Sequence, residues 1–447
     1  MSGQRQNAGT TAARRAAAEV LLDVEKGAYA NLRLKEALQG LTETDRPFCA
    51  ALVYTTLEHQ IYLDWVIEKL TKGSIKPAVR IVLRLGLCQM LLMNVPDSAA
   101  CNESVKLIKS MGKSALAGYI NGVMRNAARS REQLSPPEGM DAQSLSIRYS
   151  WPLWLVEGFL ERFGPDLTER LLAPRTEEGQ TIRVNPFAGL SEESVIRELE
   201  GRGVSLRRGA LCPQALYASG LGNIAREPFF ERGAIAVQGE SSQLVCRAAD
   251  PQPGDRVLDA CAAPGGKSLC MAAQMGRGSI LSWDLHPHRT ALIEKNAKRL
   301  GVDWIQTEVQ DAAQFRPELE KSFDLVLVDA PCSGLGVAGG KPDVKYAKSP
   351  EGIRALSETQ RAILETCCRY VRPGGTLMYA TCTISHAENE AVTEGFLKAH
   401  EEFEPADLTG YFPKEFPKER CAGGRVQLLP PLDETDGFYL AKMKRRD

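Results

Sequence analysis

Residues 257–268 read VLDACAAPGGKS, and this stretch decides the fold of the C-terminal half. A short apolar run ends at Asp259, and a glycine pair, Gly265 and Gly266, leads into a predicted helix. Glycines at such a turn let the backbone approach a ligand closely. The tail GGKS resembles a phosphate-binding loop, but Cys261 stands where that motif needs its first glycine. The dinucleotide pattern GxGxxG is also absent, so the turn serves another kind of ligand.

Outward from this stretch, short apolar runs alternate with helical patterns. The predicted strands cover residues 256–258, 280–283, 325–328 and 376–380, with helices at 287–300 and 357–371 between them. This alternation predicts a parallel sheet with right-handed crossovers. Ligands of such sheets bind at the carboxyl ends of the strands, so the residues that follow each strand are the candidate site.

Two acidic residues follow successive strands. Asp284 ends the second strand about 20 residues after the glycines, where a carboxylate can bind ribose hydroxyls, and Asp311 follows the third strand region. This combination fits an adenosine-containing ligand without a pyrophosphate. S-adenosylmethionine is the cofactor that we expect.

Two cysteines also lie at predicted strand ends. Cys332 follows Asp329 in FDLVLVDAPCSGLGV (323–337), and Cys382 lies in YATCTISHAENE (379–390). A thiolate that adds to carbon 6 of cytosine makes carbon 5 nucleophilic enough to take a methyl group. A carboxyl group such as Asp329 could control charge at ring nitrogen 3. Methylation of an exocyclic amine needs no cysteine, so two cysteines favour chemistry at a ring carbon; the residues alone leave open which cysteine attacks.

The rest of the chain divides by pattern. Residues 12–131 carry helix after helix, and LSPPEGMDAQS (134–144) has the composition of a linker. Residues 151–232 mix helices with a strand-like TIRVN (181–185). We therefore predict three domains: an all-α bundle over 1–138, a small α+β RNA-binding module over 139–235, and a Rossmann-like α/β catalytic domain over 236–447.

Composition narrows the class of protein. The chain has 447 residues, 43% hydrophobic and 25% charged, as in globular domains, and we find neither a leader nor a membrane span. Twelve cysteines without CxxC spacing, and five histidines, predict a reducing cytoplasm and no zinc site. No obligate protein partner is evident.

The net charge of −1 hides a basic first third, which favours a polyanion partner. The candidate phosphate contacts are Lys76, Arg80, Arg84, Arg125 and Arg129, with Lys341, Lys345 and Tyr346 expected near the target base. Arg183 and Asn185 are as consistent with a structural role as with RNA binding.

DACAAPGGK, VDAPCSGLGV, KPDVKY and YATCTISHAENE resemble the motifs of the Nop/Sun family of RNA 5-methylcytosine methyltransferases. The helical front, from ARRAAAEVLLDVEKGAYAN (13–31) to YINGVMRNAAR (119–129), is similar to the NusB-type RNA-binding domain. Together with WPLWLVEGFLERFG (151–164) and IRVN (182–185), nearly the whole chain resembles the bacterial members that methylate 16S ribosomal RNA of the small subunit.

The resemblance implies roles residue by residue. Cys382 would be the nucleophile, Cys332 would assist product release, and Asp329 would lie between cofactor and base. Asp284 would bind the ribose and Asp311 would lie near the adenine. The loop around the methionine and ribose of the cofactor would be Cys261, Ala262, Ala263, Pro264, Gly265, Gly266 and Lys267.

Two departures from the family pattern matter. Gly239 replaces an acidic residue in VQGESSQ (237–243), and Gly339-Gly340 replaces an arginine pair before the PD motif. Two other functions stay open: the same chemistry on transfer RNA, and a non-catalytic RNA-binding assembly factor. The presence of both cysteines argues against the second.

Overall fold

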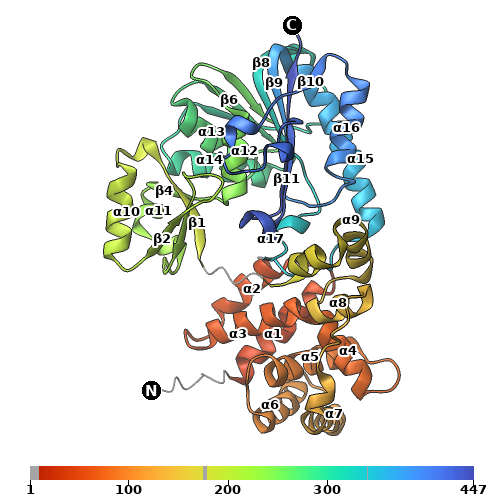
Figure 1. Cartoon of the computed structure of the whole chain (residues 1–447). Helices are drawn as coiled ribbons and strands as arrows, with labels where there is room; N and C mark the ends of the chain where they lie inside the picture. Colours follow the sequence, from red (N-terminus) through yellow and green to blue (C-terminus); the bar gives the residue numbers. More distant parts are fainter. Residues whose placement is uncertain (1–9, 175–178, 340) are drawn as a thin grey trace. The chain divides into compact units, whose positions relative to one another are not determined.

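The computed structural model describes residues 10–174, 179–339 and 341–447, which form two compact units. The first combines Met1–Pro174 with Ala338–Ala347, and the second combines Arg175–Val337 with Lys348–Asp447 (Figure 1). The three-domain division at residues 138 and 235 stays a prediction. Among the described residues, every helix is too short or too polar to cross a membrane.

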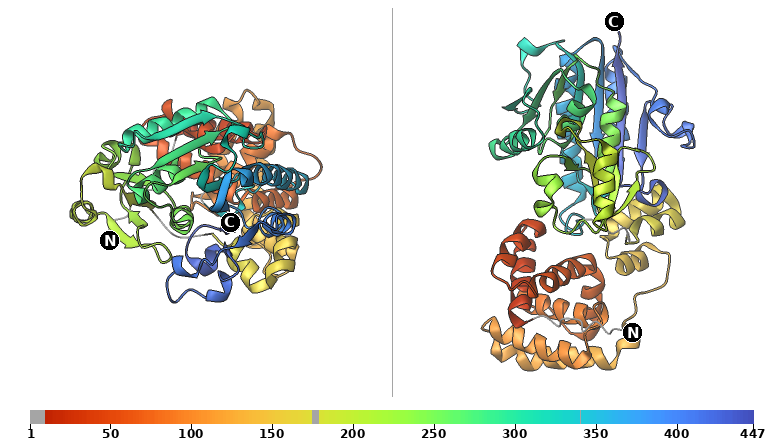
Figure 2. Two further views of the ribbon diagram at one scale, coloured as in Figure 1. Left: turned by 90° about the horizontal axis from the view of Figure 1, so that it is seen from above. Right: turned by 90° about the vertical axis from the view of Figure 1, so that its left-hand side faces the viewer.

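The first unit is helical, as predicted, and Figure 2 shows its helices, coloured red to yellow, as a bundle. The apolar stripes that recur along 12–131 pack into one core, which includes Leu52, Leu63 and Ile81. The helices are α1 (Thr11–Val24), α2 (Ala30–Gln39), α3 (Asp45–Glu58), α4 (Gln60–Leu70), α5 (Pro77–Leu91), α6 (Asp97–Ser110), α7 (Ala117–Arg129), α8 (Ala142–Tyr149) and α9 (Leu153–Leu172).

Helix α5 lies at the centre of this unit and is buried almost all round from Val79 to Met90. Gly86 permits the close approach of α6 and α7, because a Cβ there would lie 2.4 Å from Ser104 Oγ and 2.8 Å from Met124 Sδ. A helix enclosed in this way has no wide solvent face. Arg84 of this helix is therefore buried as well.

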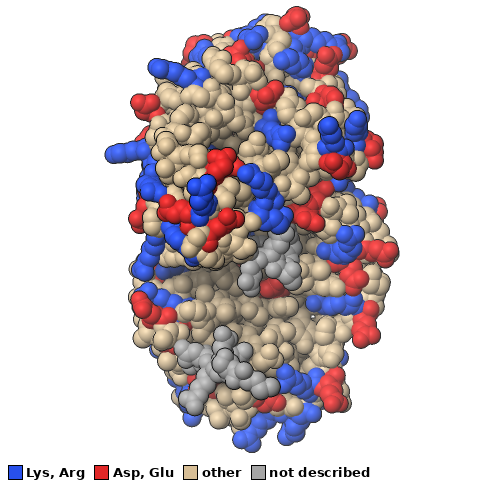
Figure 3. Space-filling view, turned by 60° about the vertical axis from the view of Figure 1, so that its left-hand side comes forward, with Lys and Arg blue, Asp and Glu red and all other residues tan. Residues whose placement is uncertain are grey.

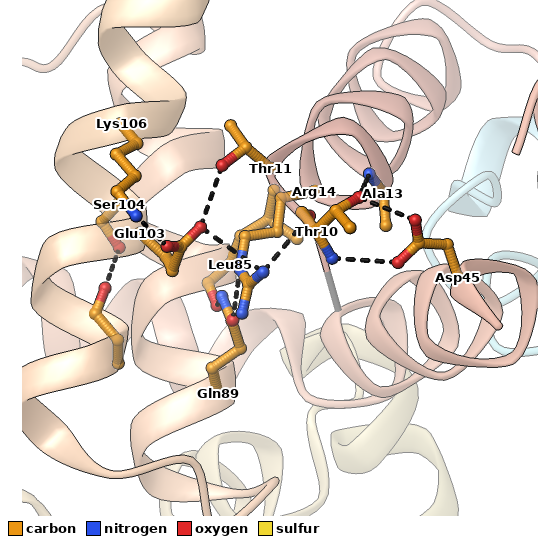
Figure 4. Close-up of polar contacts among 11 residues, drawn as sticks. Thr10, Thr11, Ala13, Arg14, Asp45, Leu85, Gln89, Glu103, Ser104 and Lys106 are labelled. Atoms are coloured by element: carbon orange, nitrogen blue, oxygen red, sulfur yellow. Dashed lines mark hydrogen bonds and ion pairs between the residues drawn. The ribbon is translucent and has the colours of Figure 1, made fainter. Parts of the chain in front are cut away.

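A buried polar cluster joins α1 to its neighbours (Figure 4). The guanidinium of Arg14, only 1% exposed, donates to Gln89 Oε1 at 2.8 Å and lies 3.5 Å from Glu103 Oε2. Thr10, which caps α1, donates from its backbone N–H and its hydroxyl to Asp45 at 2.9 and 2.8 Å. Buried polar groups with partners of this kind fix how helices pack.

The second unit begins with a small antiparallel sheet in the order β2-β3-β1-β4. Buried Ile182, Leu216 and Ile235 pack there against Val195 and Leu199 of α10. The elements are β1 (Gln180–Val184), α10 (Glu192–Gly201), β2 (Ser205–Arg208), β3 (Leu216–Ser219), α11 (Pro228–Glu231) and β4 (Ile235–Val237).

The main sheet has the order β10-β12-β9-β8-β5-β6-β7, with β11 paired to β12. The predicted parallel pairing is confirmed for β5 with β6 and β8, for β6 with β7, and for β8 with β9. The strands are β5 (Arg256–Asp259), β6 (Ser279–Asp284), β7 (Ile305–Val309), β8 (Phe323–Asp329), β9 (Val371–Thr381), β10 (Phe403–Pro405), β11 (Arg425–Leu428) and β12 (Phe438–Arg445).

Helices cover both faces of this sheet because successive strand residues point to opposite sides. Leu325 and Leu327 pack with the helices of one face, and Val326 and Val328 with those of the other. The first set is α12 (Glu240–Ala249), α13 (Gly266–Met275) and α14 (Pro287–Arg299), and the second is α15 (Pro350–Cys367) and α16 (Glu390–Ala399); α17 (Pro430–Asp433) is a single turn (Figure 1).

Two details differ from the sequence expectation. Helix α15 begins seven residues before predicted residue 357, because Ser349 caps it through a bond from the Gly352 N–H at 3.1 Å and Pro350 occupies its first turn. The C-terminal strands β10, β11 and β12 pair antiparallel, which the alternation of strands and helices upstream did not indicate.

Candidate active site

The carboxyl ends of four strands meet at one edge of the main sheet, as predicted. Asp259 pairs in register with Ser282 and Leu327, while Asp329 pairs with Ala380. The loops that follow these strands carry the CAAPGGK stretch and both candidate cysteines. The residues with predicted chemical roles therefore lie along one edge of the sheet.

The turn after β5 requires glycine. Gly265 has φ +93°, and a Cβ there would lie 3.0 Å from Ile293 Cγ2, so both the backbone and α14 exclude a side chain. Its N–H donates to the Ala262 carbonyl at 2.7 Å, and the Ala262 N–H donates to the Trp283 carbonyl at 2.7 Å. The loop is thus fixed to β6 before α13 begins, and the first N–H groups of α13 lie at its end.

A buried carboxyl group lies at the tip of β5. Asp259 is 0% exposed, and its Oδ2 accepts from the Ser268 hydroxyl at 2.6 Å, while Oδ1 has no partner. Burial raises the pKa of Asp259 to about 7, against the lowering effect of that hydrogen bond. A carboxyl oxygen without a partner beside the glycine turn fits a ligand with a hydrogen-bond donor, such as the amino group of S-adenosylmethionine.

Asp284 and Asp311 follow β6 and β7 at the same edge. Asp284 is 3% exposed and accepts from the His286 N–H at 3.2 Å, with Arg289 Nη2 3.5 Å from its other oxygen. Asp311 accepts from the Ala313 N–H at 3.0 Å. These contacts fix both carboxylates at successive strand ends, which suits the predicted binding of ribose by Asp284 and of adenine near Asp311.

Lys267 forms an ion pair with Asp329, with Nζ 2.5 Å from Oδ2. Burial lowers the pKa of Lys267, but the Asp329 charge and hydrogen bond outweigh this effect and raise its pKa overall. Lys267 therefore stays cationic. The ion pair thus holds the cation of the CAAPGGK loop at Asp329, the last residue of β8 and three residues before Cys332.

Cys332 and Cys382 approach each other from separate loops, with 3.4 Å between their Sγ atoms. The sequence predicted this juxtaposition from the ends of β8 and β9. The hydrogen bond with Cys382, followed by burial, raises the pKa of Cys332 well above its usual value. Cys332 therefore stays protonated at neutral pH. Burial likewise raises the pKa of Cys261, which keeps that loop thiol neutral.

A buried carboxylate that we did not predict supports both cysteine loops. Glu388, 0% exposed, accepts from the Ser333 N–H and hydroxyl at 2.7 and 2.6 Å, and from Gln360 Nε2 at 3.1 Å. The Ser333 hydroxyl also bonds Thr383 Oγ1 at 2.6 Å. Ser333 follows Cys332 and Thr383 follows Cys382, so Glu388 connects the residues beside both thiols. The acidic residues of SHAENE were the only sequence signal.

Asn389, the next residue, also forms hydrogen bonds to the loop that carries Cys382. It is 0% exposed; its Oδ1 accepts from the Thr381 hydroxyl at 2.6 Å, and its Nδ2 donates to the Thr383 carbonyl at 3.0 Å. These bonds flank Cys382 on both sides. The side chains of Glu388 and Asn389 thus position the thiols without touching substrate.

Three of the expected RNA contacts are wrong. Arg84 is buried and forms ion pairs with Asp64 at 2.6 Å and Glu25 at 2.8 Å, because neighbouring elements cover α5 at this position. Lys345, 4% exposed, donates to the Glu58 and Tyr149 carbonyls at 3.1 and 3.3 Å within the first unit.

Tyr346 donates to the Ser150 carbonyl at 2.9 Å, also within the first unit. Both side chains anchor the segment Ala338–Ala347 to the helices and are not available to RNA. The remaining cationic candidates are exposed: Lys76, Arg80, Arg125, Arg129 and Lys341.

Arg183 and Asn185 lie inside the second unit rather than on a surface. Asn185 donates to the Gly233 and Leu300 carbonyls at 2.8 and 2.9 Å, so its role is structural. Arg183 is buried beside a cavity of this unit. On the face drawn in Figure 3, Lys and Arg side chains are interspersed with Asp and Glu rather than gathered in one continuous basic patch.

Comparison with known proteins adds family information to this geometry. A family model described as 16S rRNA methyltransferase RsmB/F matches residues 246–444, and a NusB family model matches residues 11–129. The "Probable ribosomal RNA small subunit methyltransferase B" of Bacillus subtilis (strain 168) is 38% identical over 456 residues, covering 98% of this chain and 99% of its own. "Ribosomal RNA small subunit methyltransferase B" of Sodalis glossinidius is 31% identical and covers 96% of each chain.

Solved structures show the same fold. The crystal structure of PH0851 superposes with a TM-score of 0.81 at 28% identity, over 98% of this chain and 99% of that one. A methyltransferase homolog protein from Pyrococcus horikoshii has a TM-score of 0.57 at 25% identity, over 68% of this chain and 98% of its own. The resemblance inferred from the motifs and the predicted fold class are thereby confirmed.

Proposed function

The chain belongs to the RsmB/F family of small-subunit ribosomal RNA methyltransferases, and from this premise we propose that it methylates carbon 5 of a cytosine in 16S ribosomal RNA through a covalent bond to Cys382. It is an S-adenosylmethionine-dependent enzyme, as its family model and full-length relatives indicate. The observation that carries the proposal of a covalent mechanism is the pair of thiols 3.4 Å apart, in the loops that follow β8 and β9.

The reaction begins at Cys382. Its thiolate adds to carbon 6 of the target cytosine, and the electron pair of the 5,6 double bond becomes available at carbon 5. The cation of Lys267, held by Asp329, compensates the negative charge that develops on the ring. Asp329 itself contacts the polar edge of the base.

The cofactor, when bound, supplies a sulfonium methyl group that carbon 5 can attack. The residues that would hold it are the CAAPGGK loop, with the Asp259 oxygen that has no partner for the amino group and Asp284 for the ribose. The buried position of Asp259 and Asp284 keeps water out of these contacts.

Cys332 ends the reaction. A base takes the proton from carbon 5, and the Cys332 thiol, 3.4 Å from Cys382, donates a hydrogen bond to the departing sulfur of Cys382. The bond between Cys382 and carbon 6 breaks, the double bond re-forms, and Cys382 leaves as a thiolate.

The test is an incubation of the protein with radiolabelled S-adenosylmethionine and unmodified small-subunit ribosomal RNA, followed by digestion and separation of nucleosides. Label in 5-methylcytidine, lost in Cys382→Ser, is the expected result. Label in transfer RNA alone would keep the chemistry and overturn the substrate. Cofactor binding without transfer to any RNA would support the assembly factor instead.

A further inference from the structure

A cavity lies in the second unit, beside helix α13, which starts at the cofactor loop. It encloses about 470 Å³, a volume typical of small-ligand sites. Its polar lining comes from β1, α10, α12 and α13 and from the loops that follow β2 and α12. The side chains used in the argument are Arg183, Glu192, Cys212, Arg247, Asp250 and Cys270.

Arg183 is the unusual member of this lining. Its side chain extends from β1 and is 4% exposed. Nε donates to Gln238 Oε1 at 2.9 Å, but buried Nη1 has no partner, and no carboxylate of the described residues pairs with Arg183. A buried guanidinium without a counter-charge is strongly destabilising, so such a group points to a ligand of opposite charge.

A second guanidinium lines the same cavity. Arg247 of α12 is half-buried and has no ion pair among the described residues. The two acidic residues of the lining are already engaged elsewhere. Glu192 pairs with Arg208 at 2.6 Å, and Asp250 accepts from the Tyr411 hydroxyl at 3.0 Å. Two arginines thus remain without carboxylate partners.

One thiol of the lining lies within the field of the Arg183 cation. The hydrogen bond with Cys246 has the largest effect and lowers the pKa of Cys270; Arg183 and Lys267 lower it further, against burial, whereas burial raises the pKa of Cys212 to about 11. Arginine in turn binds phosphate through paired N–H donors.

We propose that this cavity is a phosphate-binding site in which Arg183 and Arg247 hold a backbone phosphate of the RNA substrate. The assignment of the phosphate to RNA rests on the function proposed above. Helix α13 supplies both the end of the cofactor loop and part of the cavity, at Cys270, Ala273 and Gln274. These positions lie about 6–12 Å along the helix from Gly266, a span that a few nucleotides cover.

The experiment measures the RNA affinity of the full-length protein as a function of salt. Arg247→Gln is the main variant because the half-buried Arg247 side chain forms no hydrogen bond or ion pair within the part of the chain that the structure describes, and Arg183→Gln is the second. Arg197→Gln is the matched control, since Arg197 is an exposed arginine of α10 outside the cavity. Thermal unfolding verifies that each variant folds; if Arg183→Gln does not, Arg247→Gln decides.

We expect Arg247→Gln to weaken RNA binding about tenfold at 0.15 M salt. The slope of log affinity against log salt should fall by about 0.7, the value for one phosphate contact with a single strand. Arg197→Gln should keep the wild-type affinity and slope. Calorimetric titration with inorganic phosphate alone gives the second arm, with binding to the wild type and loss in Arg247→Gln.

The outcomes of these two measurements show whether the bound phosphate belongs to RNA. A smaller slope in Arg247→Gln supports an RNA phosphate. An unchanged slope with phosphate binding lost keeps the phosphate site and overturns RNA as its source. Unchanged RNA and phosphate affinities overturn the proposal. If the slope changes but no 5-methylcytidine forms with the wild type, the phosphate site stands and the proposed methylation falls.

Discussion

Replacement of Glu388 tests whether the cysteine loops are held by a buried carboxylate. In Glu388→Ala, the Ser333 N–H and one of the two N–H groups of Gln360 Nε2 lose their acceptor at buried sites, while Gln360 keeps its bond to the Pro331 carbonyl. Each buried donor without a partner costs about 1–3 kcal/mol, and the lost side chain leaves a cavity. We expect the free energy of unfolding to fall by about 3–5 kcal/mol.

Glu388→Gln is the matched control for shape. Its amide oxygen can still accept from Ser333 and Gln360, and its amide N–H groups can donate to the hydroxyls of Ser333 and Thr383, which accept as well as donate. We therefore expect a loss of only about 1 kcal/mol. Glu358→Ala, at an exposed position of α15, should change the free energy by less than about 0.5 kcal/mol.

The assays are urea denaturation and the rate of methyl transfer with saturating RNA. A shift of about 1 Å in a reacting group lowers rates about a hundredfold, so Glu388→Ala should lose about that factor in kcat, while Glu388→Gln stays within about threefold. KM should move little, because Glu388 does not reach substrate. A Glu388→Ala protein with wild-type stability and kcat would refute the role assigned to this carboxylate.

Three further predictions concern other groups. Arg84→Ala should lower the free energy of unfolding by about 3 kcal/mol, since it leaves Asp64 and Glu25 without their cation, whereas exposed Arg80→Ala should not; equal losses in urea denaturation would contradict this. Burial lowers the pKa of Lys345 to about 7, so the unfolded chain binds more protons between that value and the ordinary lysine range, and stability should rise with pH there by up to about 1.4 kcal/mol per pH unit. Lys345→Met should flatten this slope in denaturation series, and an unchanged slope would exclude Lys345 as its cause. Gly265→Ala should cost about 1–3 kcal/mol and weaken cofactor binding in calorimetry, because φ +93° and Ile293 leave no room for a Cβ; wild-type affinity would show that the loop adapts.

The sequence predicted the catalytic edge because its signals are local. An apolar run followed by a polar residue marks the tip of a buried parallel strand, and all such tips meet at one edge. Asp284, Asp329, Cys332 and Cys382 were therefore located by their position after a strand. The separation of the two thiols was not predictable, since it depends on how two loops turn.

The wrong predictions concern side chains whose partners come from other parts of the fold. Arg84 was predicted to be a phosphate contact because it is a cation in the basic first third, but charge in the sequence does not reveal that Asp64 and Glu25 pair with it in the fold. In the same way, KPDVKY suggested a basic loop near the target, whereas Lys345 and Tyr346 pack into the helical unit. A charged residue in a pattern indicates exposure only when the neighbours of its element are known.

The sequence indicated no definite role for Glu388 or Arg183, because both side chains are buried in the fold. A buried carboxylate with several donors, or a buried guanidinium without a carboxylate partner, is defined by residues far away in the chain. Glu388 takes its donors from residues 28 and 55 positions away. No local pattern of residues encodes such a set of contacts.

The central claim is that Cys382 bonds covalently to cytosine and that Cys332 is needed to release it. The most direct test is incubation of Cys332→Ala with S-adenosylmethionine and small-subunit ribosomal RNA, followed by denaturing electrophoresis and peptide mapping. The account predicts a protein–RNA adduct that survives denaturation, attached at Cys382 and absent from the double variant Cys332→Ala, Cys382→Ser. An adduct at another residue, or full turnover by Cys382→Ser, would contradict it.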